Sequence, residues 1–179
     1  MKMMAVRMAM LLVCTGTLFA QAPPAAPKPG PEHQRLGVFV GNWTFVGEMK
    51  PTPMGPGGKM TGSDRIQWMP GGWIVERRFE GKGPMGQISG LELLGYDSAK
   101  KAYTYTFVDS TGTMGAGTMA VSGNTWNFTG AASMGGMAMQ ERCNLVLDAG
   151  GTTLKIACDM SADGKSWAPV FEGTATKAK

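Results

Sequence analysis

The chain has 179 residues, a formal net charge of +4 and a charged content of 17%. This length suits a single domain with its own hydrophobic core. The basic residues are scattered along the chain and form no Lys/Arg stripe, so a nucleic acid is not an expected partner. One histidine and three cysteines provide no Cys/His metal cluster, and the glycines form no phosphate-binding fingerprint. No cofactor is therefore expected.

The N-terminus has the pattern of a secretory signal peptide. Two basic residues precede a short apolar stretch at residues 8–19, and the small residue Ala20 follows. We expect cleavage after Ala20, so that residues 1–20 are removed. A Pro/Ala-rich flexible leader then covers residues 21–31, and one folded domain covers residues 32–179. The mature protein is expected in the periplasm or outside the cell, without a membrane-spanning segment.

Along the chain, the domain begins with one short helix and continues as strands. Pro31 suits a first helical position, and the pattern predicts a helix over residues 31–40 that ends at Gly41. Beyond it, about ten stretches alternate apolar with polar residues. The first five are predicted at residues 42–49, 60–68, 73–80, 87–96 and 102–109, with long loops at 50–58 and 81–86. This pattern predicts an all-β fold, an antiparallel up-and-down barrel of about ten strands.

A hairpin register can be read from the turn at residues 123–124. A tight two-residue turn at this Gly-Asn dipeptide pairs Val121 with Trp126 and Met119 with Phe128. All four apolar side chains then share one face of the sheet. A slip of one residue would destroy this agreement, so the register is specified by the sequence.

The next hairpin brings two cysteines together. A two-residue turn at 150–151 pairs Leu147 with Leu154 and Cys143 with Cys158. In an oxidising compartment this predicts a cross-strand disulfide, and the alternative is a pair of small buried thiols. Counting from that turn puts the cysteines at a hydrogen-bonded site, where the Cα atoms lie about 5.5 Å apart in a less favourable orientation.

Several short motifs in chain order resemble a bacterial family of uncharacterised proteins, DUF1579. Each motif alone is weak, but together they cover nearly the whole mature chain. They are EHQRL at 32–36, VGNW at 40–43, WMPGGW at 68–73, GYD at 95–97, KAY at 101–103, VDS at 108–110 and DGK at 163–165. Gly41-x-Trp43 at the start of the first strand is also similar to the lipocalin and fatty-acid-binding superfamily, the calycins.

The resemblance implies a calycin-like barrel of about ten strands and no established activity. Cys143 and Cys158 are not part of the family pattern, so a disulfide would be a local addition. Trp43 is expected to plug one end of the barrel beneath the helix. His33, the only histidine, is expected to seat the helix by a hydrogen bond rather than to serve in a site.

The inward faces of the barrel supply the candidate ligand-binding residues. Alternation places aromatic and charged side chains on one face of the third, fifth and seventh strands. The candidates are Trp73, Arg77, Phe79, Tyr103, Tyr105, Phe107, Asp109, Trp126 and Phe128. Such a lumen would suit a small apolar or amphipathic molecule carrying one polar group. The alternative is that the rings simply fill the barrel.

Arg77 and Asp109 are the charges expected to face inward. They could orient a ligand, satisfy each other or serve as the polar machinery of an enzyme. If Ile74 points inward instead, Glu76 and Arg78 take these roles. Without a histidine on a strand no Ser-His-Asp triad can be built, so catalysis has little support.

Methionine is unusually frequent. Five of the 16 methionines lie in the first 20 residues, and 11 remain in the mature chain. Met134, Met137 and Met139 are spaced so that their thioethers could hold Cu(I) or Ag(I), because soft sulfur ligands select soft ions. The alternative is that methionine serves as a flexible filler over an apolar mouth.

Overall fold

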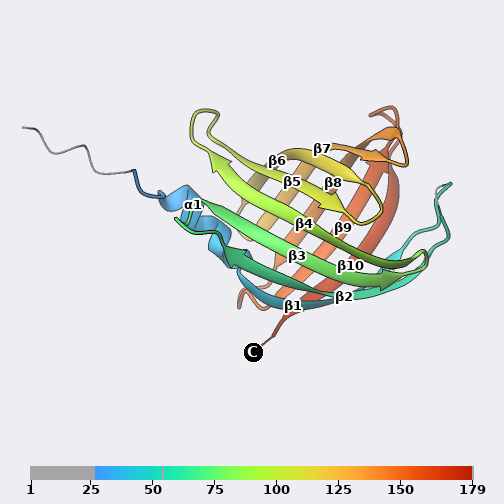
Figure 1. The fold of residues 1–179 in the computed structure, drawn as a ribbon, viewed down its shortest axis with the longest axis horizontal. Helices are drawn as coiled ribbons and strands as arrows, with labels where there is room; N and C mark the ends of the chain where they lie inside the picture. The colour runs from blue at the N-terminus through green and yellow to red at the C-terminus, as the bar shows by residue number, and fades with distance from the viewer. Residues whose placement is uncertain (1–26, 54, 179) are drawn as a thin grey trace, which may run out of the picture.

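The strands of the protein form one closed antiparallel barrel (Figure 1). The structure is a computed structural model that describes residues 27–53 and 55–178, so the expected signal peptide lies outside the described residues. Neighbouring strands follow one another in chain order, and the first strand pairs with the last. The strands are β1 (Gly41–Met49), β2 (Gly58–Trp68), β3 (Ile74–Gly83), β4 (Gly86–Asp97), β5 (Ala102–Asp109), β6 (Met114–Ser122), β7 (Thr125–Met134), β8 (Met137–Leu147), β9 (Thr153–Ser161) and β10 (Ala168–Lys177). The predicted up-and-down barrel with about ten strands is confirmed.

A short helical segment closes one end of the barrel. The predicted single helix is divided into α1 (Pro31–Arg35) and a 3₁₀ turn, η1 (Leu36–Phe39). Leu36 and Phe39 are 0% and 3% exposed, because they insert into the barrel end. Below them Trp43 is 2% exposed and its Nε1 donates a hydrogen bond to the Phe39 carbonyl oxygen at 2.8 Å. Among the described residues, no helix is both long and apolar enough to cross a bilayer.

His33 fixes the position of α1. Its Nδ1 accepts a hydrogen bond from the backbone N–H of Gly30 at 3.2 Å, and the side chain is buried. The imidazole meets the rings of Trp73 and Tyr96 edge-on, at centroid distances of 4.7 and 5.5 Å. The only histidine therefore seats the helix, as expected from the sequence, and lies away from the middle of the lumen.

Glycines lengthen two strands beyond their predicted ends. The predicted loop at 81–86 is mostly strand, because Gly83 pairs with Gly86 and only Pro84 and Met85 form the turn. Gly81 continues β3 because its missing side chain leaves room for a neighbour. A Cβ there would lie 3.2 Å from Cζ of Phe45. Glycine therefore marks close packing here rather than a loop.

The two predicted hairpin registers are correct, but one predicted turn is wrong. In β6–β7, Val121 pairs with Trp126 across a turn in which Gly123 has φ of 56°. In β8–β9, the loop covers four residues, 149–152, and is closed by a hydrogen bond from the Asp148 N–H to the Thr153 carbonyl oxygen at 2.9 Å. The side chain of Asp148 accepts the N–H groups of residues 152 and 153, which holds this wider loop.

The wider loop changes the environment of the cysteine pair. Closing the hairpin at Asp148 and Thr153 exchanges hydrogen-bonded and non-hydrogen-bonded pairs along β8 and β9. Cys143 and Cys158 therefore occupy a non-hydrogen-bonded pair, with Cα atoms 4.1 Å apart. They are joined in a disulfide on the inner wall of the barrel. The geometric difficulty expected from a two-residue turn does not arise.

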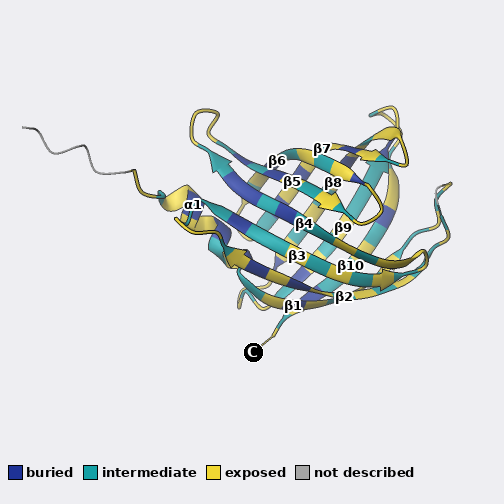
Figure 2. Ribbon diagram, viewed as in Figure 1, coloured by how far each residue is buried: buried dark blue, intermediate teal, exposed yellow. Residues whose placement is uncertain are grey.

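The inward side chains nearest α1 form the most closely packed part of the barrel (Figure 2). Inward side chains toward α1 are fully packed: Val75, Leu94 and Trp126 are 0%, 2% and 2% exposed. The other end carries the hairpin tips between β3 and β4, β5 and β6, and β7 and β8 (Figure 1). We call this end the mouth, and the α1 end the plug.

Candidate functional site

The half of the lumen toward the mouth, which we call the hollow half, is less completely packed than the plug. Phe45, Phe107, Leu145 and Ile156 point inward from four different strands, yet each keeps part of its surface accessible. Side chains packed as tightly as Val75 or Leu94 at the plug would have almost no accessible surface left. The partial exposure therefore indicates accessible space beside these side chains.

Aromatic rings lie against the wall of this hollow, over glycines of the neighbouring strand. Phe45 covers Gly62, and Phe107 covers Gly115, so that a Cβ at either glycine would come within 2.6 Å of the ring. Phe79 covers Gly90 in the same way. Because the glycines have no side chains, the rings can lie flat against the wall of the barrel.

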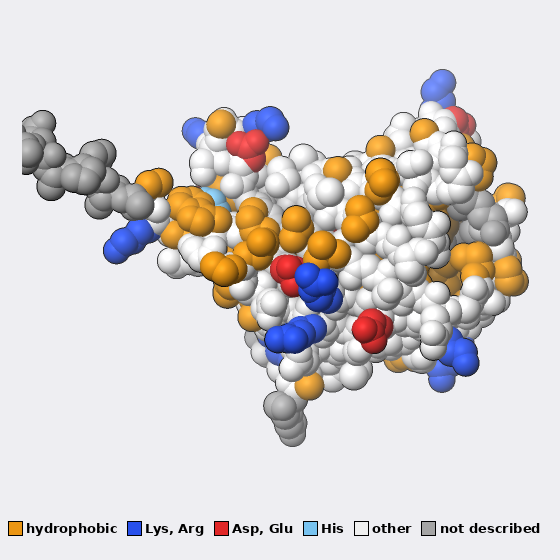
Figure 3. All heavy atoms as spheres, in the orientation of Figure 1, with side chains coloured by type: hydrophobic (Ala, Val, Ile, Leu, Met, Phe, Trp, Pro, Cys, Tyr) orange, Lys and Arg blue, Asp and Glu red, His pale blue; other side chains and the backbone are white. Residues whose placement is uncertain are grey.

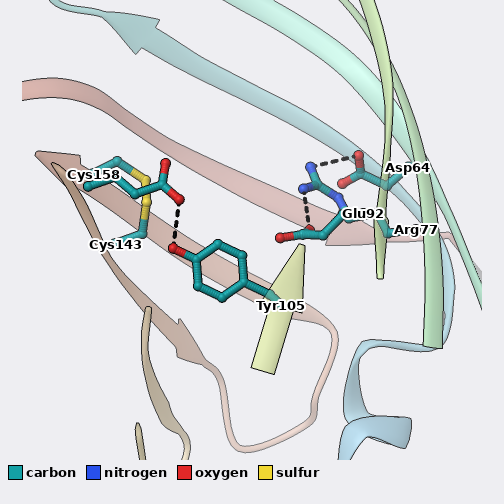
Figure 4. Close-up of polar contacts among 7 residues, drawn as sticks. Asp64, Arg77, Glu92, Tyr105, Cys143 and Cys158 are labelled. Atoms are coloured by element: carbon teal, nitrogen blue, oxygen red, sulfur yellow. Dashed lines mark hydrogen bonds and ion pairs between the residues drawn. A yellow bond between two sulfur atoms is a disulfide. The ribbon is translucent and has the colours of Figure 1, made fainter. Parts of the chain in front are cut away.

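The longest such row crosses four strands. Tyr105 on β5 pairs with Gly117 on β6, which pairs with Gly130 on β7, which pairs with Glu141 on β8. The two glycines let the tyrosine ring lie across β6 and β7. Its hydroxyl then donates a hydrogen bond of 2.6 Å to Oε1 of Glu141 (Figure 4).

Arg77 lies across the lumen from this row and holds two carboxylates (Figure 4). Its Nη1 donates to Oε2 of Glu92 at 2.9 Å, and its Nη2 donates to Oδ1 of Asp64 at 3.0 Å. Burial by itself would lower the pKa of the guanidinium, but the charges of Asp64 and Glu92 outweigh it and raise that pKa. The side chain of Arg77 is 29% exposed although it faces inward, which again indicates open space beside it.

The environment of the lumen shifts the pKa values of Tyr105 and Glu141 in the same direction. Burial raises the pKa of Glu141; the hydrogen bond from Tyr105 opposes this rise, and the charge of Glu92 adds to it. Burial and the Glu141 carboxylate both raise the pKa of Tyr105. The tyrosine therefore remains the donor of the pair at all ordinary pH values.

Three of the predicted ligand-binding residues belong to the plug instead. Trp126 packs edge-on against Phe39 with ring centroids 4.8 Å apart, and Tyr103 packs against Trp126 at 5.2 Å. Trp73 precedes β3 and contacts His33. These rings close the α1 end of the barrel. The hollow half does receive the predicted Arg77, Phe79, Tyr105, Phe107 and Phe128.

Asp109 is not part of the lumen. Its Oδ1 accepts hydrogen bonds from the backbone N–H groups of Thr111 and Thr113, at 2.8 and 3.1 Å, and caps the turn between β5 and β6. Of the roles considered for Arg77 and Asp109, mutual pairing is therefore excluded, because the local turn satisfies this carboxylate first. Glu76 and Arg78 form an ion pair of 2.8 Å in which Arg78 is largely exposed, so the alternative assignment of faces on β3 is also excluded.

The carboxyls that do face the lumen were not among the predicted site residues. Asp64, Glu92 and Glu141 are each less than a tenth exposed. The sequence contained a signal for Glu141, because it lies two residues before Cys143 on a strand whose inward face the cysteine register already defined. Among residues 27–53 and 55–178, no group of three His, Cys, Asp or Glu side chains could hold a metal ion.

Methionines gather at the mouth. Met134 pairs with Met137 at the tip of the β7–β8 hairpin, and Met139 follows two residues later on the same face of β8. Met160 faces Glu141 from β9 and so adjoins Met139 diagonally. Hydrophobic side chains are correspondingly visible at the end of the barrel opposite α1 (Figure 3).

Comparison with known proteins agrees with this architecture. The fold is a closed ten-stranded antiparallel β-barrel, and the chain belongs to the DUF1579 family, whose model, "Protein of unknown function (DUF1579)", matches residues 28–177. The crystal structure of Rv2717c from M. tuberculosis is similar with a TM-score of 0.62 and 12% identity, covering 84% of this chain and 99% of that one. A fluorescence-activating β-barrel designed de novo has a TM-score of 0.44 and 16% identity, over 79% and 95% of the two chains. No curated protein matches the chain.

Proposed function

We propose that the protein is an exported carrier or sensor that binds a small, mostly apolar molecule in the hollow half of its barrel. The observation that carries this proposal is the set of rings packed over glycines, which provides an apolar wall, beside inward side chains that keep accessible surface. The Tyr105–Glu141 pair and the Arg77 group place a few polar atoms on that wall. An apolar pocket with a few convergent polar groups is the usual form of a small-molecule site.

A dye-binding experiment with a matched pair of variants tests this proposal. The uncharged dye Nile red should brighten when it enters the lumen of the purified protein. Leu145→Trp adds bulk to the hollow half and should abolish the signal, whereas Val146→Trp adds the same bulk to the outer wall and should leave it unchanged. Equal dye binding by the two variants, or none by the unmodified protein, would contradict the proposal.

Native mass spectrometry of protein purified from its own compartment identifies the natural occupant. A mass excess matching an organic molecule in the unmodified protein, and its loss in Leu145→Trp, is the expected result. Export is proposed on the N-terminal sequence, and the disulfide between Cys143 and Cys158 supports an oxidising compartment. Detection of the mature protein in the cytosolic fraction alone would overturn this location.

A second candidate function rests on the mouth methionines. The cross-strand pairing of Met134 with Met137, with Met139 on the same face, brings three thioethers within reach of one Cu(I) or Ag(I) ion. Competition with a Cu(I) chelator should show affinity in the unmodified protein and its loss when all three are changed to leucine. Met69→Leu, at the plug end, is the control. Unchanged copper affinity in the triple variant would exclude this site.

A further inference from the structure

The polar part of the hollow carries an excess of negative charge. The side chains of Asp64, Glu92 and Glu141 are buried, with residue exposures of 7%, 9% and 8%. Among the described residues, Arg77 is the only cation that these carboxyls contact. One guanidinium therefore faces three carboxyl groups in an enclosed space, where opposite charge is scarce and water is limited.

The positive charge of Arg77 is already outweighed by its partners. Its terminal nitrogens donate to two carboxylates, at 2.9 Å to Glu92 and 3.0 Å to Asp64. An anionic ligand would add a further negative charge beside these buried carboxylates. The lumen is thus unfavourable for a carboxylate or phosphate group.

Glu141 has the opposite property, because one of its oxygens is unused. Oε1 accepts the hydrogen bond of Tyr105, and no described residue donates to Oε2. No fully buried side-chain oxygen or nitrogen among the described residues lacks a partner, so Oε2 must be accessible from the lumen. A carboxyl group that is nine-tenths buried, with one oxygen open to the hollow, is a site for a hydrogen-bond donor.

We infer that the ligand of this lumen carries a protonated amine, whose N–H groups bond to Oε2 of Glu141. This inference rests on the proposed function and names the chemical class of its ligand. The ammonium supplies the positive charge that Arg77 alone does not provide, and an N⁺–H···O⁻ bond is stronger than one between neutral groups.

The aromatic rings around Tyr105 are suited to an amine that carries an apolar phenyl or alkyl group. Phe128 packs against Tyr105 with ring centroids 5.1 Å apart, and Phe107 lies parallel to Tyr105 at 6.5 Å. Aromatic faces attract a desolvated cation as well as an apolar chain. A ligand with a phenyl or alkyl body and a terminal ammonium therefore satisfies both parts of the wall.

Three probes of similar size and different charge test the inference. They are 4-phenylbutylamine, 4-phenylbutan-1-ol and 4-phenylbutanoate, and each is used to displace Nile red at neutral pH. The amine should bind about tenfold more tightly than the alcohol, as expected for one hydrogen bond to a charged group, and the carboxylate should bind most weakly. If the dye binds but the alcohol or the carboxylate matches the amine, the inference is overturned while the proposed function stands.

A matched pair of variants locates the effect. Glu141→Gln keeps an acceptor for Tyr105 but removes the charge, and it should abolish the preference for the amine. Glu76→Gln makes the same change on the outer wall, beside Arg78, and should leave the preference intact. A preference that survives in Glu141→Gln would contradict the assigned residue.

A pH series on the unmodified protein tests the same inference without a substitution. The titratable groups around the hollow are Asp64, Arg77, Glu92, Tyr105 and Glu141. As the pH falls and the carboxyls take up protons, the affinity for the amine should fall while that for the alcohol stays constant. Parallel behaviour of the two probes would overturn the inference.

Discussion

Arg77 compensates the negative charges of the carboxylates on the polar side of the lumen. Without it, Asp64 and Glu92 would be two carboxylates facing each other in a confined space, with no cation among the described residues to compensate them. The guanidinium satisfies both because its planar fork presents two terminal nitrogens in different directions. The contribution of Arg77 to the free energy of unfolding is therefore best measured by replacing Arg77 first alone and then together with Asp64 and Glu92.

Arg77→Met should lower the free energy of unfolding by about 3 kcal/mol, because it leaves two buried carboxylates unpaired. Adding Asp64→Asn and Glu92→Gln to that variant should recover most of the loss. The exposed Arg78→Met, which breaks only a surface ion pair, should cost less than about 1 kcal/mol. Urea unfolding followed by tryptophan fluorescence measures the free energy of unfolding of each variant. An unchanged value for Arg77→Met would show that Asp64 and Glu92 are not ionised in the folded protein.

Glu141 should make the protein less stable as the pH rises. Burial raises its pKa above the ordinary value of 4.5, so the folded state keeps a proton that the unfolded state releases. The unfolded state then binds fewer protons, and the free energy of unfolding falls as the pH rises through the range above 4.5. Glu141→Gln cannot ionise and should lack this decline, which unfolding curves from pH 4.5 upward would reveal.

Asp163 provides the contrast in sign. Backbone N–H groups of Ser166 and Lys165 lower the pKa of its exposed carboxylate, so its contribution is lost only as the pH falls below the ordinary value of 3.8. Asp163→Asn should therefore lower the free energy of unfolding by a constant amount at higher pH, and its stability curve should approach that of the unmodified protein as the pH falls below 3.8. A difference between the two proteins that grows as the pH falls would contradict this assignment.

At the scale of strands, the inward glycines set how close neighbouring elements can come. A Cβ at Gly115 would meet mainly the ring of Phe107, at 2.5 Å, whereas a Cβ at Gly117 would meet the backbone carbonyl oxygen of Thr129. A side chain can be shortened, but a paired strand cannot move aside. The two glycines should therefore respond differently to the same substitution.

Gly115→Ala and Gly117→Ala should each cost about 2–3 kcal/mol, as overpacked sites do. Phe107→Leu should rescue most of the loss in Gly115→Ala and none of it in Gly117→Ala. Gly150→Ala, in an exposed loop with no neighbour closer than 3.5 Å to the new Cβ, is the control. Thermal unfolding of these single and double variants distinguishes the cases, and equal rescue of both glycines would refute the backbone contact.

The alternation of the sequence was sufficient for the barrel and for the hairpin registers, because one buried face leaves few alternative pairings. It failed where a local hydrogen bond competes with the period of two. Asp109 lies at an inward position but caps its own turn, and Asp148 widens the loop that two glycines had suggested would be tight. Both errors come from carboxylates beside tight turns, whose hydrogen bonds depend on backbone conformation rather than on composition.

The pairing of Tyr105 with Glu141 was beyond the reach of the sequence for a different reason. The two residues lie 36 positions apart and meet only because two intervening strands each place a glycine in the same row. The strand patterns predicted which way each side chain points, but not that the rows of four strands would align. Only the stagger of the closed barrel determines that alignment.

For the molecule as a whole, the structure joins a packed half to a hollow half. The plug contains Leu36 at 0% exposure, whereas Leu145 in the hollow half keeps part of its surface accessible. We therefore expect the packed half to contribute more to the free energy of unfolding than the hollow half. A barrel with such a division can change its lumen without losing its fold.

Leu36→Ala should cost about 2–5 kcal/mol, because it opens a cavity in a packed region. Leu145→Ala deletes the same atoms beside existing space and should cost only about 1 kcal/mol, since little new cavity is created. Urea unfolding compares the two. Equal costs would mean that the mouth half is as well packed as the plug.

The pairing of β1 with β10 has a consequence for how the chain reaches this state. Gly47 on β1 lies opposite Gly173 on β10. β1 therefore cannot form this pairing until β10, the last of the ten strands, has been synthesised. Until β10 arrives, both β1 and β9 present unsatisfied backbone groups along a full edge, and such edges invite pairing between different chains. Ring closure between segments so distant in sequence is also slow. The growing chain therefore needs protection from its own copies until the ten residues of β10 are in place.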